Sequence, residues 1–217
     1  MALIAIGVMW LAVAGMIAVV IRLQVPSPAE LLSDVAGRRP MWIAANVVLI
    51  VQQSLFVLAV RGLTGRLGAN ANAAVRGLLA ICGGALVSSG VFHGVLGAHL
   101  ASKVSDGPLP TDLVLDAELV HALGDTFWFV GVGAMTAATA VASFSEWGRD
   151  RLLTWLGLGA VIANGLQFGW FIDHAFGVFA APGTLLQAGW FAAAGIRVAR
   201  DQDGLRVSGP DPRPSPG

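Results

Sequence analysis

Three ionisable side chains in the middle of the chain follow a helical spacing. Glu118, His121 and Asp125 occupy positions i, i+3 and i+7, which lie on one face of a helix. Asp125 lies about 10 Å further along that helix than Glu118, at ~1.5 Å per residue. His121 and Asp125 are four residues apart, close enough to hydrogen-bond. A histidine with a carboxylate partner can take up and release protons, so this pair is a candidate acid–base couple.

Two further sets of polar residues share helical faces. Asn164, Gln167 and His174 lie on one face, and Asn46 and Gln53, seven residues apart, lie on another. The simplest packing turns all of these faces inward, around a pocket that opens outward. The ligand-binding residues that we predict are Glu118, His121, Asp125, Asn164, Gln167, His174, His93, Asn46 and Gln53.

The histidines allow more than one chemistry. Haem could be ligated by His93 or His99, with His121 or His174 as the second ligand. Two or three histidines with a carboxylate can also bind a divalent metal. The sequence contains no HExxH, CxxC, phosphate-loop or Gly-x-Ser-x-Gly motif, so it assigns no residue as a metal ligand. Lys103, the only lysine, lies in a connector, which excludes a retinal-type Schiff base.

Each of these residues also has a purely structural explanation. Glu118 and His174 could lie at the water interface, and His93 could bond to a neighbouring backbone. Buried Asn and Gln side chains often hold membrane helices together. Asp125 lies deeper, where a carboxylate is costly, so it favours a function or a specific buried pair.

Six long apolar stretches must position these side chains. Crossing a hydrocarbon core takes about 20 helical residues, and each stretch is long enough. Charged residues make up only 12% of the chain, against ~25% in soluble domains. We therefore expect an all-α bundle of six membrane spans whose partner is the lipid bilayer. The net charge of zero does not support nucleic-acid binding. The stretches are 1–21, 41–60, 78–100, 113–144, 152–176 and 178–198.

Basic residues are unevenly divided between the two sets of connectors. Of the 13, nine fall on the side that carries the C-terminal tail and four on the other. We therefore expect a multi-pass protein of the plasma membrane, and the positive-inside rule places both of its termini in the cytoplasm. We expect one transmembrane domain over residues 1–200 and a disordered cytoplasmic tail over 201–217.

Smaller signals add local expectations. Ser27 and Glu30 have the spacing of a capping box, which predicts a short interfacial helix in the first connector. Glycines at 90, 94 and 97 predict a helix-packing surface. Trp42 and Trp190 are expected to anchor span ends at the membrane interface. The single cysteine, Cys82, excludes an intrachain disulfide and a Cys-based zinc or iron–sulfur site.

Three stretches resemble a family of uncharacterised bacterial six-span membrane proteins of the actinobacterial type. They are ELLSDVAGRRPMWIAANVVLI, ELVHALGDTFWFVG and LLTWLGLGAVIANGLQFGWFIDHAFG. The resemblance implies an integral membrane protein without an assigned activity or cofactor, and it transfers no catalytic residue.

Three functional hypotheses follow from the sequence. The first is a membrane protein that holds a small or lipid-phase ligand in the polar pocket. The second is a membrane enzyme acting on an isoprenoid, quinone or other lipid, with His121 and Asp125 as its catalytic acid–base pair. The third is a b-type haem or metal protein.

Overall fold

The computed structural model describes residues 2–20, 27–64, 67–104, 108–145, 149–171 and 178–207. Over these ranges the chain is helical and contains no β-strand, which confirms the expected all-α class. The elements are α1 (Ala2–Val20), α2 (Pro28–Gly37), α3 (Arg39–Thr64), α4 (Ala69–Gly90), the π-helix η1 (Val91–Gly97), α5 (Ala98–Ala101), α6 (Thr111–Ser145), α7 (Arg151–Gln167), the 3-10 helix η2 (Phe168–Phe171) and α8 (Ala180–Val207).

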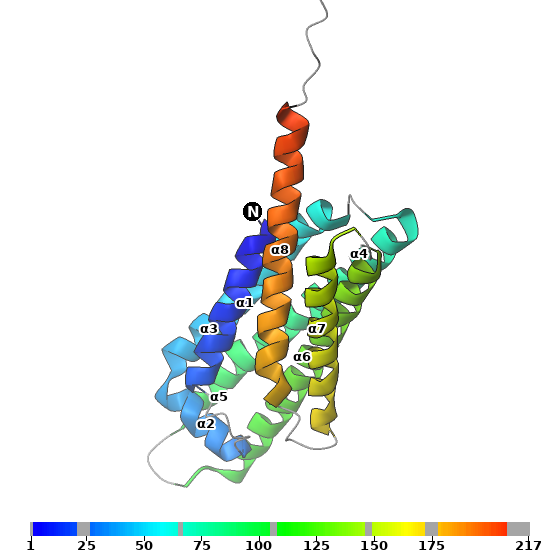
Figure 1. Cartoon of the computed structure of the whole chain (residues 1–217). Coiled ribbons are helices and arrows are strands. Elements are labelled where there is room, and N and C mark those ends of the chain that lie inside the picture. The colour runs from blue at the N-terminus through cyan, green and yellow to red at the C-terminus, as the bar shows by residue number, and fades with distance from the viewer. Residues whose placement is uncertain are drawn as a thin grey trace, which may run out of the picture.

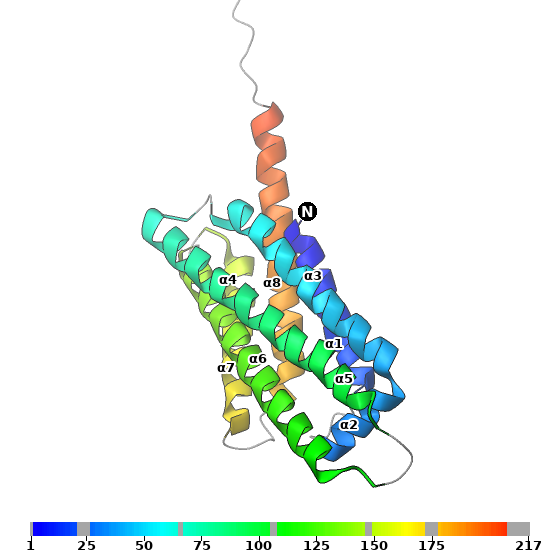
Figure 2. The ribbon, with the colours of Figure 1, turned by 180° about the vertical axis from the view of Figure 1, so that it is seen from behind.

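Six helices close into a ring. The order around it is α1, α3, α4, α6, α7 and α8; each packs on the next, and α8 packs on α1. Figures 1 and 2 show these helices running side by side, with α2 across one end of the bundle. The chain begins, and α8 ends, toward the opposite end. Neighbours in the ring are therefore also neighbours in the sequence, as short connections between antiparallel helices favour.

Two continuous helical segments are long and apolar enough to cross a membrane. One runs through α4, η1 and α5, from Ala69 to Ala101, and the other is α6. The other four expected stretches also coincide with helices, namely α1, α3, α7 with η2, and α8.

The short helix expected in the first connector is present as α2. The Ser27 hydroxyl accepts a hydrogen bond from the Glu30 backbone N–H, and the Ser27 N–H donates to the Glu30 carboxylate at 2.8 Å. This capping box satisfies two N–H groups that the first turn would otherwise leave open. Beyond the cap, α2 buries Leu31, Leu32 and Val35 against α5 and α6.

The last helix is longer than expected. Residues 201–217 were expected to form a disordered tail, but α8 continues to Val207. The sequence contains no proline between the end of the apolar stretch and Pro210, so nothing in it breaks the helix earlier. Residues 208–217, and the tight link expected near Gly177, lie outside the described residues.

The interior of the ring is filled by apolar side chains. Trp10 of α1 stacks on Trp128 of α6 with parallel rings whose centroids are 5.6 Å apart. Fully buried aliphatic and aromatic side chains surround this pair. They include Ile6, Leu49, Leu86, Met135 and Phe191.

Glycines set the approach of α3 to α4 and η1. A Cβ atom at Gly90 would lie 2.9 Å from Ile50 Cγ1, and one at Gly94 would lie 2.5 Å from Asn46 Cβ. At Gly97 the nearest atoms would be 3.7 Å away, an ordinary contact distance. The packing surface predicted from these glycines is thus confirmed at Gly90 and Gly94, whereas Gly97 has room for a side chain.

We predict that Gly90→Leu and Gly94→Leu each destabilise the bundle by about 1–3 kcal/mol, because the added side chain forces α3 away. Gly84→Leu is the matched control on the same helix, since nothing lies within 4 Å of a Cβ atom there. Thermal unfolding in detergent, followed by circular dichroism, measures the difference. Equal melting temperatures for all three variants would contradict close packing at this face.

Candidate functional site

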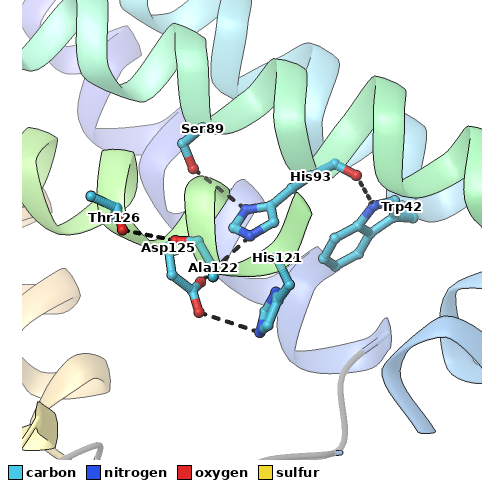
Figure 3. Close-up of polar contacts among 7 residues, drawn as sticks. All are labelled: Trp42, Ser89, His93, His121, Ala122, Asp125 and Thr126. Carbon is cyan, nitrogen blue, oxygen red and sulfur yellow. Dashed lines mark hydrogen bonds and ion pairs between the residues drawn. The ribbon is translucent and has the colours of Figure 1, made fainter. Parts of the chain in front are cut away.

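Two histidines converge on one carboxylate near the α2 end of the bundle (Figure 3). His121 Nε2 lies 3.3 Å from one oxygen of Asp125, and His93 Nε2 lies 3.4 Å from the other. The two imidazole centroids are 5.3 Å apart. His121 and Asp125 both belong to α6, where the i,i+4 spacing brings them together locally. His93 comes from η1 and requires the fold.

A glycine lets His93 reach this carboxylate. Gly124 precedes Asp125 and is buried, and a Cβ atom on it would run into the His93 imidazole ring. The ring therefore lies directly against the α6 backbone. Any other residue at position 124 would have to displace His93 from Asp125.

A tryptophan side chain forms a hydrogen bond to the π-helical backbone at His93. The Trp42 indole N–H donates a hydrogen bond of 2.7 Å to the His93 backbone oxygen. In turn, the Asn46 side-chain amide donates to the Trp42 carbonyl at 2.9 Å. A π-helix is rare and often accompanies a functional site, because its wider turn changes where side chains point. Here it presents His93 to α6.

The second nitrogen of His93 also has a polar neighbour. Its Nδ1 lies 3.4 Å from Ser89 Oγ, one turn earlier. If Nδ1 carries the proton and donates it to Ser89, then the Nε2 lone pair faces the Asp125 carboxylate, and a metal ion between them would satisfy both. If Nε2 carries the proton, its N–H group can donate to the carboxylate directly. His93 Nε2 is buried and makes no hydrogen bond of good geometry with the described residues.

The three donor atoms have the arrangement of a metal site. One nitrogen from each histidine and one carboxylate oxygen all lie within 4.8 Å of one another. Ligands of a tetrahedral ion with bonds of about 2.0–2.2 Å are roughly 3.4 Å apart, so side-chain rotation alone would bring the set to ligand distances. The Asp125 side chain is 44% exposed, which leaves a route for an ion to enter.

A small apolar cavity adjoins both histidines. Its volume is about 30 Å³, which is room for about one water molecule. Apart from the two histidines and the indole of Trp42, its lining is apolar, and the three large side chains of α2 close one side. The lining consists of Leu31, Leu32, Val35, Trp42, His93, Gly97, Leu100, Ala117, Val120 and His121.

The other predicted site residues do not join this cluster. Glu118 is exposed on α6, and Gln167 is half-buried at the end of α7. His174 lies outside the described residues. Gln53 is buried, and neither end of its amide has a partner among the described residues. Asn46 supports the cluster only indirectly, through Trp42.

Asn164 belongs to a separate polar network that joins three helices. Its side-chain amide donates to Gln187 of α8 at 3.4 Å, and the Gln187 amide donates to Thr139 of α6 at 2.9 Å. All three side chains are buried. We expected Asn164, Gln167 or His174 to lie across from His121 and Asp125. Among the described residues His93 lies there and Asn164 and Gln167 do not, whereas His174 is outside the described residues. The α7 polar residue instead holds α6, α7 and α8 together, as buried amides do in membrane bundles.

Three residues of the site, Trp42, Ser89 and Gly124, were not predicted to belong to it. Trp42 was expected at the membrane interface, but it is buried and bonded to the backbone of η1. Trp190, also expected at the interface, is buried too. A Ser four residues before a His was a visible signal for Ser89, since that spacing places both on one helical face. Nothing in the sequence distinguishes Gly124 from the other helical glycines.

Comparison of the chain with family models, with curated proteins and with solved structures found no match. The resemblance to six-span bacterial membrane proteins therefore gains no support from relatives. A functional proposal therefore rests on the geometry of the site.

We predict that Trp42→Phe lowers the free energy of unfolding by about 1–3 kcal/mol more than Trp10→Phe does. Both tryptophans are buried, but only Trp42 donates a hydrogen bond; the Trp10 indole N–H has no partner among the described residues. Losing the donor removes the hydrogen bond to the partly buried His93 carbonyl, which costs about that amount. Thermal unfolding of the two variants in detergent gives the difference, and equal losses would contradict the role of this bond.

Proposed function

We propose that the protein is a six-span membrane protein that binds a divalent transition-metal ion through His93, His121 and Asp125. The observation that carries the proposal is the convergence of two imidazole nitrogens and a carboxylate from separate helical segments. Imidazole nitrogens suit zinc, iron, copper and nickel. Two histidines with one carboxylate leave further positions open for water or a substrate.

The membrane placement draws support from the surface of the ring. Large apolar side chains are strongly exposed on several of its helices, and a soluble monomer rarely exposes extensive apolar patches. In a bilayer these side chains would contact lipid. They include Val8 on α1, Val47 on α3, Ile81 on α4, Leu119 on α6, Ile162 on α7 and Leu185 on α8.

The volume beside the histidines favours an ion over an organic ligand. A cavity of about 30 Å³ is far smaller than the ~300–1,000 Å³ of typical small-molecule sites. The hypothesis of a small or lipid-phase ligand in this pocket, and that of a lipid enzyme using His121 and Asp125, both need more space. A metal ion needs none beyond the space between its ligands.

Haem fits this cluster less well than a bare ion. A macrocycle ligated by both histidines would have to lie between rings whose centroids are 5.3 Å apart. One face of that space is closed by Gly124, against which His93 packs. His99, the other histidine considered for haem, is exposed on α5.

We predict that the purified protein binds one Zn²⁺ or Co²⁺ per chain at neutral pH. His93→Gln, His121→Ala and Asp125→Asn should each lower the affinity at least about 100-fold, because loss of an outer-shell partner alone typically costs ~10–100-fold. Isothermal titration with Zn²⁺ measures affinity, and the visible absorption of bound Co²⁺ reports its coordination geometry.

Two controls separate this site from scattered surface binding. Glu118→Gln removes an exposed carboxylate on the same helix, and His99→Gln removes an exposed histidine nearby; neither should change the affinity. Gly124→Ala should weaken binding without removing any donor, because the added methyl group displaces His93. Wild-type affinity in the three ligand variants would overturn the metal site.

We further propose that both termini face the cytoplasm of a bacterial plasma membrane, so that the metal site lies toward the outer side. The nine-to-four division of basic residues between the two sides supports this orientation. Fusion of a cytoplasm-dependent fluorescent reporter after Gly217 should give a signal, and fusion of a periplasm-dependent phosphatase at the same place should not. Phosphatase activity at this position would reverse the orientation.

A further inference from the structure

A groove on the outside of the ring lies between α3 and the α4–η1–α5 segment. Its volume is about 410 Å³, within the ~300–1,000 Å³ range of small-molecule sites. Most of its lining is aliphatic or glycine, and the exposed Val47 and Val95 stand on its two walls. The lining consists of Arg39, Ile43, Asn46, Val47, Ile50, Gly90, Gly94, Val95, Ala98, His99 and Ser102.

The polar residues of the groove gather at one end. The close contacts of Gly94 with Asn46 and of Gly90 with Ile50 show that the two segments run antiparallel. In this register the first residue of α3, Arg39, lies opposite the end of α5. His99 and Ser102 are at that end, and both are exposed. The opposite end, near Ile50, lies about 16 Å deeper at ~1.5 Å per residue.

This distribution of charge matches an anionic amphiphile. The Arg39 guanidinium and the His99 imidazole can donate hydrogen bonds to a phosphate, and arginine does so with two parallel bonds. The Ser102 hydroxyl already donates to the His99 backbone oxygen at 2.6 Å. None of the described residues that line the groove is acidic. Basic pockets between membrane helices on the cytoplasmic side bind anionic lipid head groups, and Arg39 offers the same chemistry at the outer end of this groove. Below the head-group end, the apolar walls offer a surface for an acyl chain.

We infer that this groove binds an anionic phospholipid of the surrounding bilayer. The phosphate lies against Arg39 and His99, and one acyl chain runs along Val47 and Val95. The inference rests on the membrane placement proposed above but not on the metal. The groove and the metal site are nevertheless joined in the structure, because Asn46 lies in the groove and bonds to Trp42, which bonds to His93.

The test uses the delipidated full-length protein in a mild detergent. Phosphatidylglycerol and phosphatidylcholine with identical acyl chains are titrated separately, and lipid binding is followed by native mass spectrometry and by the melting temperature. We expect phosphatidylglycerol to bind at one site per chain and raise the melting temperature by several degrees. Phosphatidylcholine should not, because its choline cation offsets the charge of the phosphate. Free glycerol phosphate should not, because it lacks the acyl chains.

Variants then assign the binding to the groove. Arg39→Ala should lower the affinity for phosphatidylglycerol about tenfold, as the loss of a charge-assisted hydrogen bond does. Val47→Trp, and independently Val95→Trp, should abolish binding by filling the groove. Ile162→Trp is the matched control, because Ile162 is an equally apolar and exposed residue on α7. Each variant is included only if its gel-filtration profile and circular dichroism spectrum match the wild type. If neither groove variant meets this standard, Arg39→Ala alone decides whether the lipid binds in the groove.

Two outcomes would overturn the inference. One is equal binding of phosphatidylglycerol and phosphatidylcholine, which would show nonspecific lipid contact. The other is wild-type lipid binding in Arg39→Ala or in the groove variants, which would place the lipid elsewhere. The membrane placement is tested separately: a protein that stays monodisperse without detergent would contradict it, whatever the lipid titrations show.

Discussion

Contact between glycine backbone and a side chain of the next helix is the constraint on which this structure depends. Gly90 and Gly94 admit Ile50 and Asn46 of α3, and Gly124 admits the imidazole of His93. In the membrane placement proposed above, lipid and protein would be equally apolar, and close packing rather than water exclusion would hold the helices together. The same contacts that close the ring therefore fix the distance between His93 and Asp125, so that fold and site cannot be varied independently here.

The positions of the six long helices could be read from the sequence because each coincides with a predominantly apolar stretch. The short helix α2 could also be read, since Ser27 and Glu30 carry a local signal that does not depend on the rest of the fold. The end of α8 could not be predicted from the sequence. Its last residues are polar, and a polar segment without proline is compatible with both a helix and a coil.

The site was predictable only as far as its interactions are local. His121 and Asp125 are neighbours through helical geometry alone, so their spacing was enough. The approach of His93 depends on which helix lies next to α6 and on the irregular turn in η1. Neither the choice of neighbouring helix nor the turn produces a periodic signal in the sequence. The face of α7 shows the opposite failure: the spacing of Asn164 and Gln167 is helical, but the partners of Asn164 are Gln187 and Thr139 rather than the histidines. Polar spacing identifies a face, whereas tertiary packing selects its partner.

The π-helical turn between Val91 and Gly97 also divides the segment into two registers. An α-helix advances about 100° per residue, so the wider turn rotates everything after it relative to everything before it. His93 faces α6 while His99 and Ser102, in the new register, face the groove beside α3. Deletion of one residue from this turn would restore a regular helix and swing the later residues away from Arg39. Along this stretch the length of the chain is therefore as much a determinant of structure as the identity of its residues, and an insertion or deletion would be more disruptive than most substitutions.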